Sequence, residues 1–247
     1  MTADTPRFNG DDIVVLVTGP SGAGKSTFIN TLLKKPRMRV GHGVDPCTTE
    51  VDYAMIESPN RGPRIIIVDT PGFDSSRESD AETLRRIAAW IESTLDQTGS
   101  ISGIIYLHDI SSGHCPALNR HDMRTLERTI CSVPREKALA RLALVTTKWG
   151  RVLDPADGPT DKECESLLHG GCWKGLIEGG SIVDRFRNTS ADAWRIISKF
   201  VDQGTPGISV ERDEIRKVQN RLKDKNASSK SFVQILRLLG LFGWSGR

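Results

Sequence analysis

The sequence lacks any apolar stretch of the roughly 20 residues that a membrane-spanning helix requires. Its first twelve residues are polar and include acidic side chains, so they do not resemble the apolar core of a secretory signal. The chain also lacks a large excess of one charge sign, because its 34 Lys and Arg residues are nearly balanced by 31 Asp and Glu residues. The concentrated basic face of a nucleic-acid binder is therefore not expected. We predict a cytoplasmic protein that binds no nucleic acid.

Cysteine is scarce as well. The five cysteines are scattered and odd in number, which favours reduced thiols over a disulfide framework. Cys164, His169 and Cys172 lie close together in the sequence, but their spacing matches no standard zinc module. A metal site at these three residues is therefore not favoured.

Short apolar runs and helical patterns alternate along the chain. The runs with the length and β-branched composition of buried strands are residues 13–17, 65–68, 101–107 and 142–146. Apolar side chains at helical spacing predict helices over residues 81–96, 122–131 and 191–201. This alternation predicts an α/β fold, with a mostly parallel sheet and helices on both of its faces.

Two segments between these elements have a different character. Residues 51–56 alternate polar and apolar side chains, which predicts an antiparallel strand at the edge of the sheet. Residues 151–180 are rich in Gly, Asp and Pro and predict an irregular insertion before the last strand. The whole α/β domain is expected to span residues 11–203.

The most informative motif runs from Gly19 to Thr27 and fits G-x-x-x-x-G-K-[ST], the phosphate-binding P-loop. Its glycines let the backbone N–H groups point at phosphate oxygens, and the following helix contributes a positive dipole end. Lys25 is expected to neutralise the β- and γ-phosphates, and Ser26 to offer its hydroxyl to Mg2+. The residues predicted to bind a nucleoside triphosphate here are Gly19, Ser21, Gly22, Ala23, Gly24, Lys25, Ser26 and Thr27.

A second motif, Asp69-Thr70-Pro71-Gly72, follows the strand predicted at residues 65–68. A carboxylate at the end of a core strand can hold a water on Mg2+, and Gly72 brings a backbone N–H close to a γ-phosphate. Together with the P-loop, this motif resembles the TRAFAC-type GTPases. That resemblance implies a P-loop GTPase domain, with Asp69 at the metal and Gly72 in the catalytic machinery.

The segment from Gly41 to Val51 occupies the place of switch I in such GTPases. The resemblance implies a threonine there that binds Mg2+ through its hydroxyl. Thr48 is the first choice and Thr49 the alternative. The predicted metal ligands are thus Ser26, Thr48 and Asp69, and the predicted catalytic residues are Lys25, Thr48 and Gly72.

Three further stretches narrow the resemblance to the immunity-associated (GIMAP) and Toc-type paraseptin GTPases. They are Tyr106–Ile110, Cys47–Val51 and the DTPGF sequence that ends at Phe73. The resemblance covers residues 12–201 and implies that these proteins associate through their nucleotide faces.

The sequence departs from the family at the guanine-reading motif, [NT]-K-x-D. The chain has Thr147-Lys148-Trp149-Gly150, so a glycine replaces the aspartate that accepts hydrogen bonds from guanine. In the family, this carboxylate discriminates against other bases because they would leave it unpaired. Since the chain lacks the carboxylate, its preference for guanine is expected to be weaker. Asp154, in the next loop, is an alternative acid that could reach the base.

The remaining base contacts are predicted from Thr147, Lys148, Trp149 and Asn188. Trp149 is either a ring that stacks on the base or a packed aromatic. Asn188 matches the place of a base-contacting Asn in the GIMAP relatives, whereas Ser190-Ala191 matches the alternative S-A-K type of motif.

Phe73 stands where Ras-like enzymes have a glutamine that positions the attacking water. Phenylalanine cannot hydrogen-bond a water, so slow intrinsic hydrolysis is expected. Asp74, His42, a partner or a second copy of the chain would then complete the site.

These features predict a GTP-binding switch that cycles between GTP and GDP, with slow Mg2+-dependent hydrolysis and an output through protein association. The first alternative is a P-loop kinase, which the DTPG turn and the switch-like threonine disfavour. The second is a non-catalytic nucleotide-binding scaffold with relaxed base specificity, which Gly150 and Phe73 favour.

Residues 208–247 are predicted to form a helical C-terminal extension after a turn-rich linker at residues 204–207. Residues 211–226 predict a solvated helix, and residues 232–244 an almost wholly apolar one. The apolar helix is expected to dock on the G domain or on a partner copy. The alternative is a peripheral membrane contact, with Trp244 at the headgroups.

Overall fold

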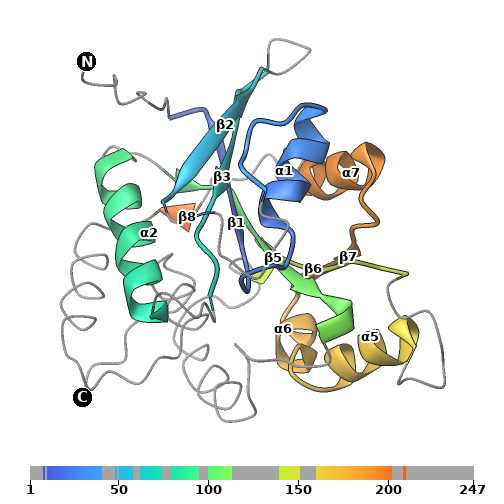
Figure 1. Cartoon of the computed structure of the whole chain (residues 1–247). Coiled ribbons are helices and arrows are strands. Elements are labelled where there is room, and N and C mark those ends of the chain that lie inside the picture. Colours follow the sequence, from blue (N-terminus) through green and yellow to red (C-terminus); the bar gives the residue numbers. More distant parts are fainter. Residues whose placement is uncertain are drawn as a thin grey trace, which may run out of the picture.

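The computed structural model describes residues 8, 10–40, 48, 50–57, 62–73, 79–94, 100–112, 139–150, 160–201 and 208–209. A six-stranded sheet with the order β2-β3-β1-β5-β6-β7 lies at its centre (Figure 1). The strands of this sheet are β1 (Ile13–Thr18), β2 (Asp52–Ile56), β3 (Ile65–Asp69), β5 (Gly103–Asp109), β6 (Leu142–Thr147) and β7 (Ile182–Arg185). The helices are α1 (Lys25–Leu33), α2 (Asp80–Thr94), α5 (Asp161–Gly170), α6 (Lys174–Glu178) and α7 (Ser190–Val201), with a 3-10 turn, η1 (Ile110–Ser112).

All pairings in the sheet are parallel except one. β1 pairs in parallel with both β3 and β5, and β6 with both β5 and β7. β2 pairs antiparallel with β3, with Asp52 opposite Asp69 and Ile56 opposite Ile65. The predicted parallel sheet with an antiparallel edge strand at residues 51–56 is confirmed.

Helices cover both faces of the sheet, as the alternation of elements predicted (Figure 1). Successive residues of β1 point to opposite sides. Val14 and Leu16 join a core cluster with residues of α2, α5 and α6. Val15 and Val17 join a second cluster with residues of α1 and α7. β1 is buried along its whole length, because a central parallel strand has apolar neighbours on both sides.

The run at residues 101–107 does not form one strand. Ile101 belongs to a short strand, β4 (Ser100–Ile101), and β5 begins only at Gly103. β4 pairs antiparallel with β8 (Ile208–Ser209) in a separate two-stranded sheet. The first two residues of the expected helical extension are therefore strand, and they contact the α/β domain.

The expected irregular insertion at residues 151–180 is wrong for its second half, which contains α5 and α6. α5 begins with a capping box: the Thr160 side chain accepts from the Glu163 backbone N–H, and the Glu163 carboxylate accepts from Thr160. Two backbone donors at the helix start are satisfied in this way. The T-x-x-E signal was present in the sequence and outweighs the Gly-rich composition around it.

Several expectations fall outside the described residues. These are the helices at 122–131, 211–226 and 232–244, the linker, and the alternative site residues His42, Thr49, Asp74 and Asp154. Within the described part of the chain, no helix is both long and apolar enough to cross a membrane.

The expectation of five reduced thiols is wrong, because the structure contains a disulfide. Cys164 is a buried free thiol, but Cys172 is disulfide-bonded. In the described ranges, no group of three or more His, Cys, Asp or Glu side chains could hold a metal ion.

Candidate nucleotide-binding site

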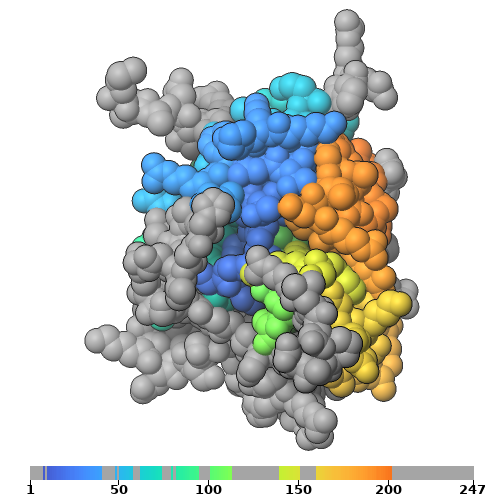
Figure 2. Space-filling model, turned by 45° about the vertical axis from the view of Figure 1, so that its right-hand side comes forward, coloured from blue at the N-terminus to red at the C-terminus, as the bar shows by residue number. Residues whose placement is uncertain are grey.

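The loops that carry the sequence motifs follow the carboxyl ends of parallel strands, where α/β proteins bind their ligands. The P-loop follows β1, the DTPG turn follows β3, and residues 147–150 lie at the end of β6. Figure 2 shows α1 (blue), the end of β5 with η1 (green), residues 139–150 and α5 (yellow) and α7 (orange) together on one face of the molecule. Residues far apart in the sequence therefore meet at a single site.

Glycine is required at both ends of the P-loop. Gly19 has a φ of 141°, and a Cβ there would lie 2.2 Å from the Leu107 carbonyl oxygen. Gly24 caps α1 in the left-handed conformation, with a φ of 95°. The first N–H groups of α1 follow directly and have no intrahelical acceptors, so they are available to an anion.

Lys25 is the buried cation of this loop. Its Nζ donates to the carbonyl oxygens of Gly19, at 3.1 Å, and Pro20, at 2.9 Å. Burial lowers the pKa of Lys25 to about 8, although Asp69 acts in the opposite direction. The side chain remains mainly charged at neutral pH, and a phosphate beside it would compensate the charge that burial has desolvated.

The three predicted metal ligands come together beside Lys25. The Ser26 hydroxyl donates to Asp69 Oδ2 at 2.7 Å, and its oxygen lies 3.2 Å from Thr48 Oγ1. Asp69 Oδ1 is buried and has no hydrogen-bond partner among the described residues. Burial raises the pKa of Asp69 to about 6, against the hydrogen bond from Ser26. Hard oxygen donors with one unsatisfied carboxylate oxygen fit Mg2+, and these residues would hold it.

The DTPG turn is fixed directly against the P-loop. The Thr70 hydroxyl donates to the Val17 carbonyl at 2.9 Å. The Ser21 N–H donates to the Phe73 carbonyl at 2.7 Å, and the Phe73 N–H donates to the Gly19 carbonyl at 3.2 Å. A Cβ on Gly72 would lie 2.5 Å from Ser21 Cα, so only glycine allows this approach.

The Phe73 side chain is fully buried in the apolar cluster that contains Leu84 and Ile87 of α2. It fills the core beneath the turn and supplies no polar group to the site. Phe73 therefore cannot orient a water, because its side chain is apolar and lies in the core.

Thr147 and Lys148 tie the end of β6 to neighbouring loops. Thr147 Oγ1 lies 2.8 Å from the Ala23 carbonyl oxygen of the P-loop. Lys148 has a φ of 60°, and its Nζ donates to Asp109 Oδ2 at 2.6 Å. Asp109 is itself oriented, because it accepts from the backbone N–H of Ser111 at 3.0 Å. Asp109 belongs to the family-like stretch Tyr106–Ile110, but no local pattern in the sequence marks its contact with Lys148.

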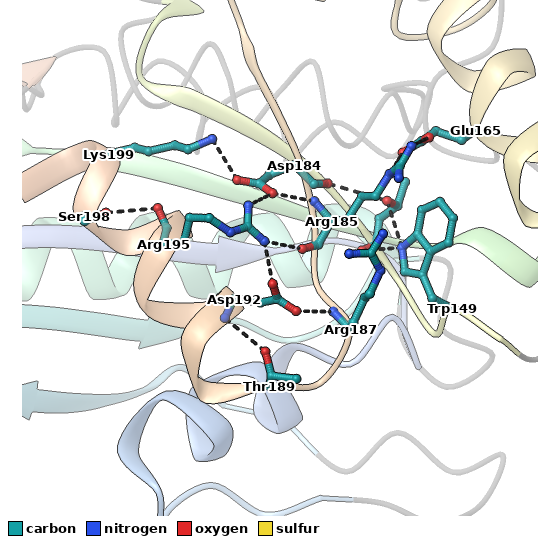
Figure 3. Close-up of polar contacts among 11 residues, drawn as sticks. Trp149, Glu165, Asp184, Arg185, Arg187, Thr189, Asp192, Arg195, Ser198 and Lys199 are labelled. Carbon is teal, nitrogen blue, oxygen red and sulfur yellow. Dashed lines mark hydrogen bonds and ion pairs between the residues drawn. The ribbon is translucent and has the colours of Figure 1, made fainter.

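Trp149 is half-buried and packs against the core. Its indole N–H donates back to Thr146, and the Arg185 guanidinium lies over its ring, 4.8 Å from the centroid. Arg187 approaches the same ring at 5.8 Å (Figure 3). Of the two interpretations, these contacts support the packed aromatic, and base stacking by Trp149 stays a prediction.

Asn188 lies in the loop before α7 in the left-handed conformation, with a φ of 62°. Its Oδ1 accepts from the Thr31 hydroxyl of α1 at 3.2 Å. Ser190 and Ala191 are already helical, at the start of α7. The structure thus places Asn188 in the loop and Ser190-Ala191 in the helix, and which of the two positions contacts a base stays a prediction.

A polar network holds this loop and β7 between two helices (Figure 3). Arg185 pairs with the buried Glu165 of α5 through both oxygens of that carboxylate. Asp184 pairs with Arg195 and Lys199 of α7. Because both carboxylates of these pairs are buried, the pairs fix the backbone from which Asn188 projects.

Comparison with known proteins agrees with this geometry. Residues 14–148 match the family model described as 50S ribosome-binding GTPase. The chain belongs to this GTPase family. Among solved structures, the chain resembles Toc33 from Arabidopsis thaliana in complex with GDP and Mg2+, at 17% identity and a TM-score of 0.56. That similarity covers 80% of this chain and 86% of Toc33, and at this identity it shows the shared fold.

Curated relatives match shorter segments. Cell division control protein 12 of Saccharomyces cerevisiae is 38% identical over 71 residues, which are 26% of this chain and 17% of that protein. Septin-2B of Xenopus tropicalis is 29% identical over 109 residues, or 41% of this chain and 28% of that protein. The chain thus matches less than a third of either relative. The family match confirms the expected P-loop GTPase domain, and the similarity to Toc33 confirms the expected fold.

Proposed function

We propose that this protein binds GTP with Mg2+, hydrolyses it slowly and acts as a switch through protein association. One observation carries the proposal: a buried lysine lies beside a Ser26–Asp69–Thr48 cluster that joins the P-loop, the DTPG strand and switch I. Each member comes from a different segment, and Asp69 keeps a buried oxygen without a hydrogen-bond partner among the described residues, which supports a bound phosphate–metal group there.

The chemistry follows from the positions of these groups. Lys25 and the N-terminal amides of α1 would neutralise the β- and γ-phosphates. Ser26, Thr48 and Asp69 would hold Mg2+, which would supply further neutralisation of the phosphate charge. Gly72 lets its own backbone N–H approach the γ-phosphate. Thr48 would report the presence of that phosphate to switch I, since its hydroxyl belongs to the same cluster.

Hydrolysis is expected to be slow because no described side chain occupies the water-orienting position. Phe73 faces the core, and His42 and Asp74 lie outside the described residues. A second copy could complete the site across the nucleotide face. For the structurally similar chloroplast translocon components atToc33 and psToc159, dimerization is important for the GTPase activity, and we propose a homodimer here by analogy.

A non-catalytic scaffold is the second candidate, because Phe73 and Gly150 remove one catalytic and one specificity group. A P-loop kinase is less favoured, since the DTPG turn packs on the P-loop where a kinase would need an acceptor pocket.

For the C-terminal extension we propose docking of residues 232–244 on the G domain or on a partner copy, with a peripheral membrane contact as the alternative. Deleting residues 228–247 separates the two, because docking predicts lost stability without lipid and membrane binding predicts lost co-sedimentation with anionic liposomes.

The central experiment measures binding of GTP and ATP with and without Mg2+, followed by phosphate release at several protein concentrations. Asp69→Asn is expected to abolish the Mg2+ dependence of GTP affinity. Ser198→Ala is the matched control, because that hydroxyl only donates to the Arg195 carbonyl on α7. Tight GTP binding that is unaffected by Mg2+ or by Asp69→Asn would contradict the metal site, and turnover that never exceeds background would favour the scaffold.

A further inference from the structure

Gly150 leaves a gap at the position where the family motif has its guanine-reading carboxylate. Its φ is 82°, and a Cβ built on it would meet nothing within 4 Å. The space is therefore open, and no neighbouring side chain among the described residues has filled the place of the missing aspartate. A different acid, however, reaches the same backbone: the Gly150 N–H donates to Asp161 Oδ2 at 2.7 Å.

Asp161 is held there by the way α5 begins. It is the first residue of α5, directly after Thr160. The capping box formed by Thr160 and Glu163 fixes this turn, with the Thr160 N–H donating to Glu163 Oε2 at 2.8 Å. The Asp161 carboxylate is thus set by a helix terminus and not by a long loop, which restricts its position.

The second carboxylate oxygen is unsatisfied. Asp161 Oδ1 is buried and has no hydrogen-bond partner among the described residues. A buried carboxylate oxygen normally has a donor, because leaving it unpaired is costly. The unpaired oxygen belongs to a carboxylate already bonded to the guanine-motif backbone, so a base held by that motif is the donor that best accounts for it.

We propose that Asp161 supplies the guanine-reading carboxylate that position 150 has lost. Guanine presents N1–H and the exocyclic N2–H2 as donors to a carboxylate. Adenine presents an acceptor at N1 and no amine at C2, so it would leave the carboxylate unpaired. This inference rests on the proposed GTP binding and names the residue that decides its base specificity.

The neighbouring residues agree with this assignment. Lys148 is fixed by Asp109 beside the same loop, so a base over its stem would lie next to Gly150. The Asp161 carboxylate lies within hydrogen-bond distance of the Gly150 N–H. An aspartate at position 150 would therefore place a second negative charge close to Asp161, and the two charges would repel each other. Glycine at 150 and an acid at 161 are therefore a consistent pair.

The test is the affinity of the full chain for GTP, ATP and XTP, measured by calorimetry for the wild type and for Asp161→Asn. The wild type is expected to prefer GTP over ATP. Asp161→Asn should lose roughly tenfold to a hundredfold in GTP affinity, the effect of one unpaired buried polar contact. It should gain affinity for XTP, because an amide N–H2 can donate to the xanthine O2 that replaces the guanine amine. A purely structural role would not raise XTP affinity.

Two further variants complete the test. Glu163→Gln perturbs the same helix start without touching the Gly150 contact, and it should keep the GTP preference. Gly150→Asp in the Asp161→Asn background should restore part of the preference for GTP over XTP, although a φ of 82° at position 150 strains any side chain there. If Asp161→Asn is partly unfolded, its ratio of GTP to XTP affinity still decides the matter, because unfolded protein lowers both affinities equally.

The outcomes separate this inference from the proposed function. Wild-type binding of GTP and ATP with equal affinity, or Asp161→Asn with unchanged GTP and XTP affinities, would overturn the role of Asp161 and leave nucleotide binding intact. A wild type that binds no nucleotide at all would instead overturn the proposed function.

Discussion

Gly72→Ala is the substitution whose effect is most directly determined by the structure. The new Cβ would lie 2.5 Å from Ser21 Cα, 2.7 Å from Ser21 N and 3.0 Å from Lys25 Nζ. Carbon atoms in ordinary contact are about 3.5–4.0 Å apart, so the turn must move by about 1 Å. The lysine can rotate away, but the Ser21 backbone belongs to the P-loop and cannot.

The energetic cost has two parts. Overpacking a tight site costs about 1–3 kcal/mol. The shift also lengthens the two backbone hydrogen bonds that join Phe73 to Ser21 and Gly19, at 2.7 and 3.2 Å. Each such bond contributes about 1 kcal/mol, and part of that would be lost. We expect a loss of roughly 2–4 kcal/mol, either as lower stability or as a displaced DTPG turn.

Urea denaturation and GTP calorimetry on the same samples distinguish these two results. A displaced turn would keep global stability and lower the affinity for GTP more than for GDP, because Gly72 serves the γ-phosphate. Gly170→Ala is the control, since a Cβ at that position meets nothing within 4 Å. If Gly72→Ala matched this control in both stability and nucleotide affinity, the close contact between the DTPG turn and the P-loop would be refuted.

The remaining predictions concern the phosphate site, the core and acid stability. Lys25→Ala and Ser26→Ala should each lower GTP affinity with Mg2+ by roughly tenfold to a hundredfold in calorimetry, and unchanged affinity in both would reject the site. Phe73→Gln should destabilise the fold by about 3–5 kcal/mol without faster phosphate release, because its side chain points into the core. Per-molecule hydrolysis should rise with protein concentration, and a fast, concentration-independent rate would contradict the homodimer. Burial lowers the pKa of His108 from 6.5 to about 4, against the charge of Asp109. As the pH falls, His108 is therefore protonated at a higher pH in the unfolded chain than in the folded one. The free energy of unfolding should consequently decrease by about 3 kcal/mol between pH 6.5 and pH 4. His108→Phe should flatten that dependence in urea titrations at the two pH values.

The strands and the P-loop could be predicted because each is specified locally. A buried parallel strand needs a continuous apolar run, and the run at residues 13–17 leaves no other assignment. The division of residues 101–107 could not be predicted in this way. It depends on β8, a partner more than 100 positions away, which removes Ile101 from the main sheet.

In the candidate site, too, residues that belong to local motifs could be predicted, whereas contacts between distant elements could not. Lys25, Ser26 and Asp69 belong to motifs whose spacing already implies their chemistry. Thr48 lies beside Ser26, as a metal ligand would, and its role at the metal stays a prediction. Contacts between distant elements, such as Lys148 with Asp109, carry no local pattern that marks them.

Trp149 shows the limit of residue type alone. Its ring suits both a nucleotide base and a guanidinium, because each can stack on an aromatic face. The structure supplies the guanidinium of Arg185, which comes from β7 and could not be assigned to this ring from the sequence.

α5 shows how one missed local signal hid part of the site. Once Thr160 and Glu163 are recognised as a capping box, the helix must start at Asp161, and its first turn faces the loop that ends at Gly150. An acid at the first position of a helix is usually explained by the macrodipole alone. Here its carboxylate also accepts from the backbone of a base-reading motif that lacks its own acid. In this inference, the carboxylate that the motif lacks at position 150 is replaced by one that a neighbouring helix terminus holds in place.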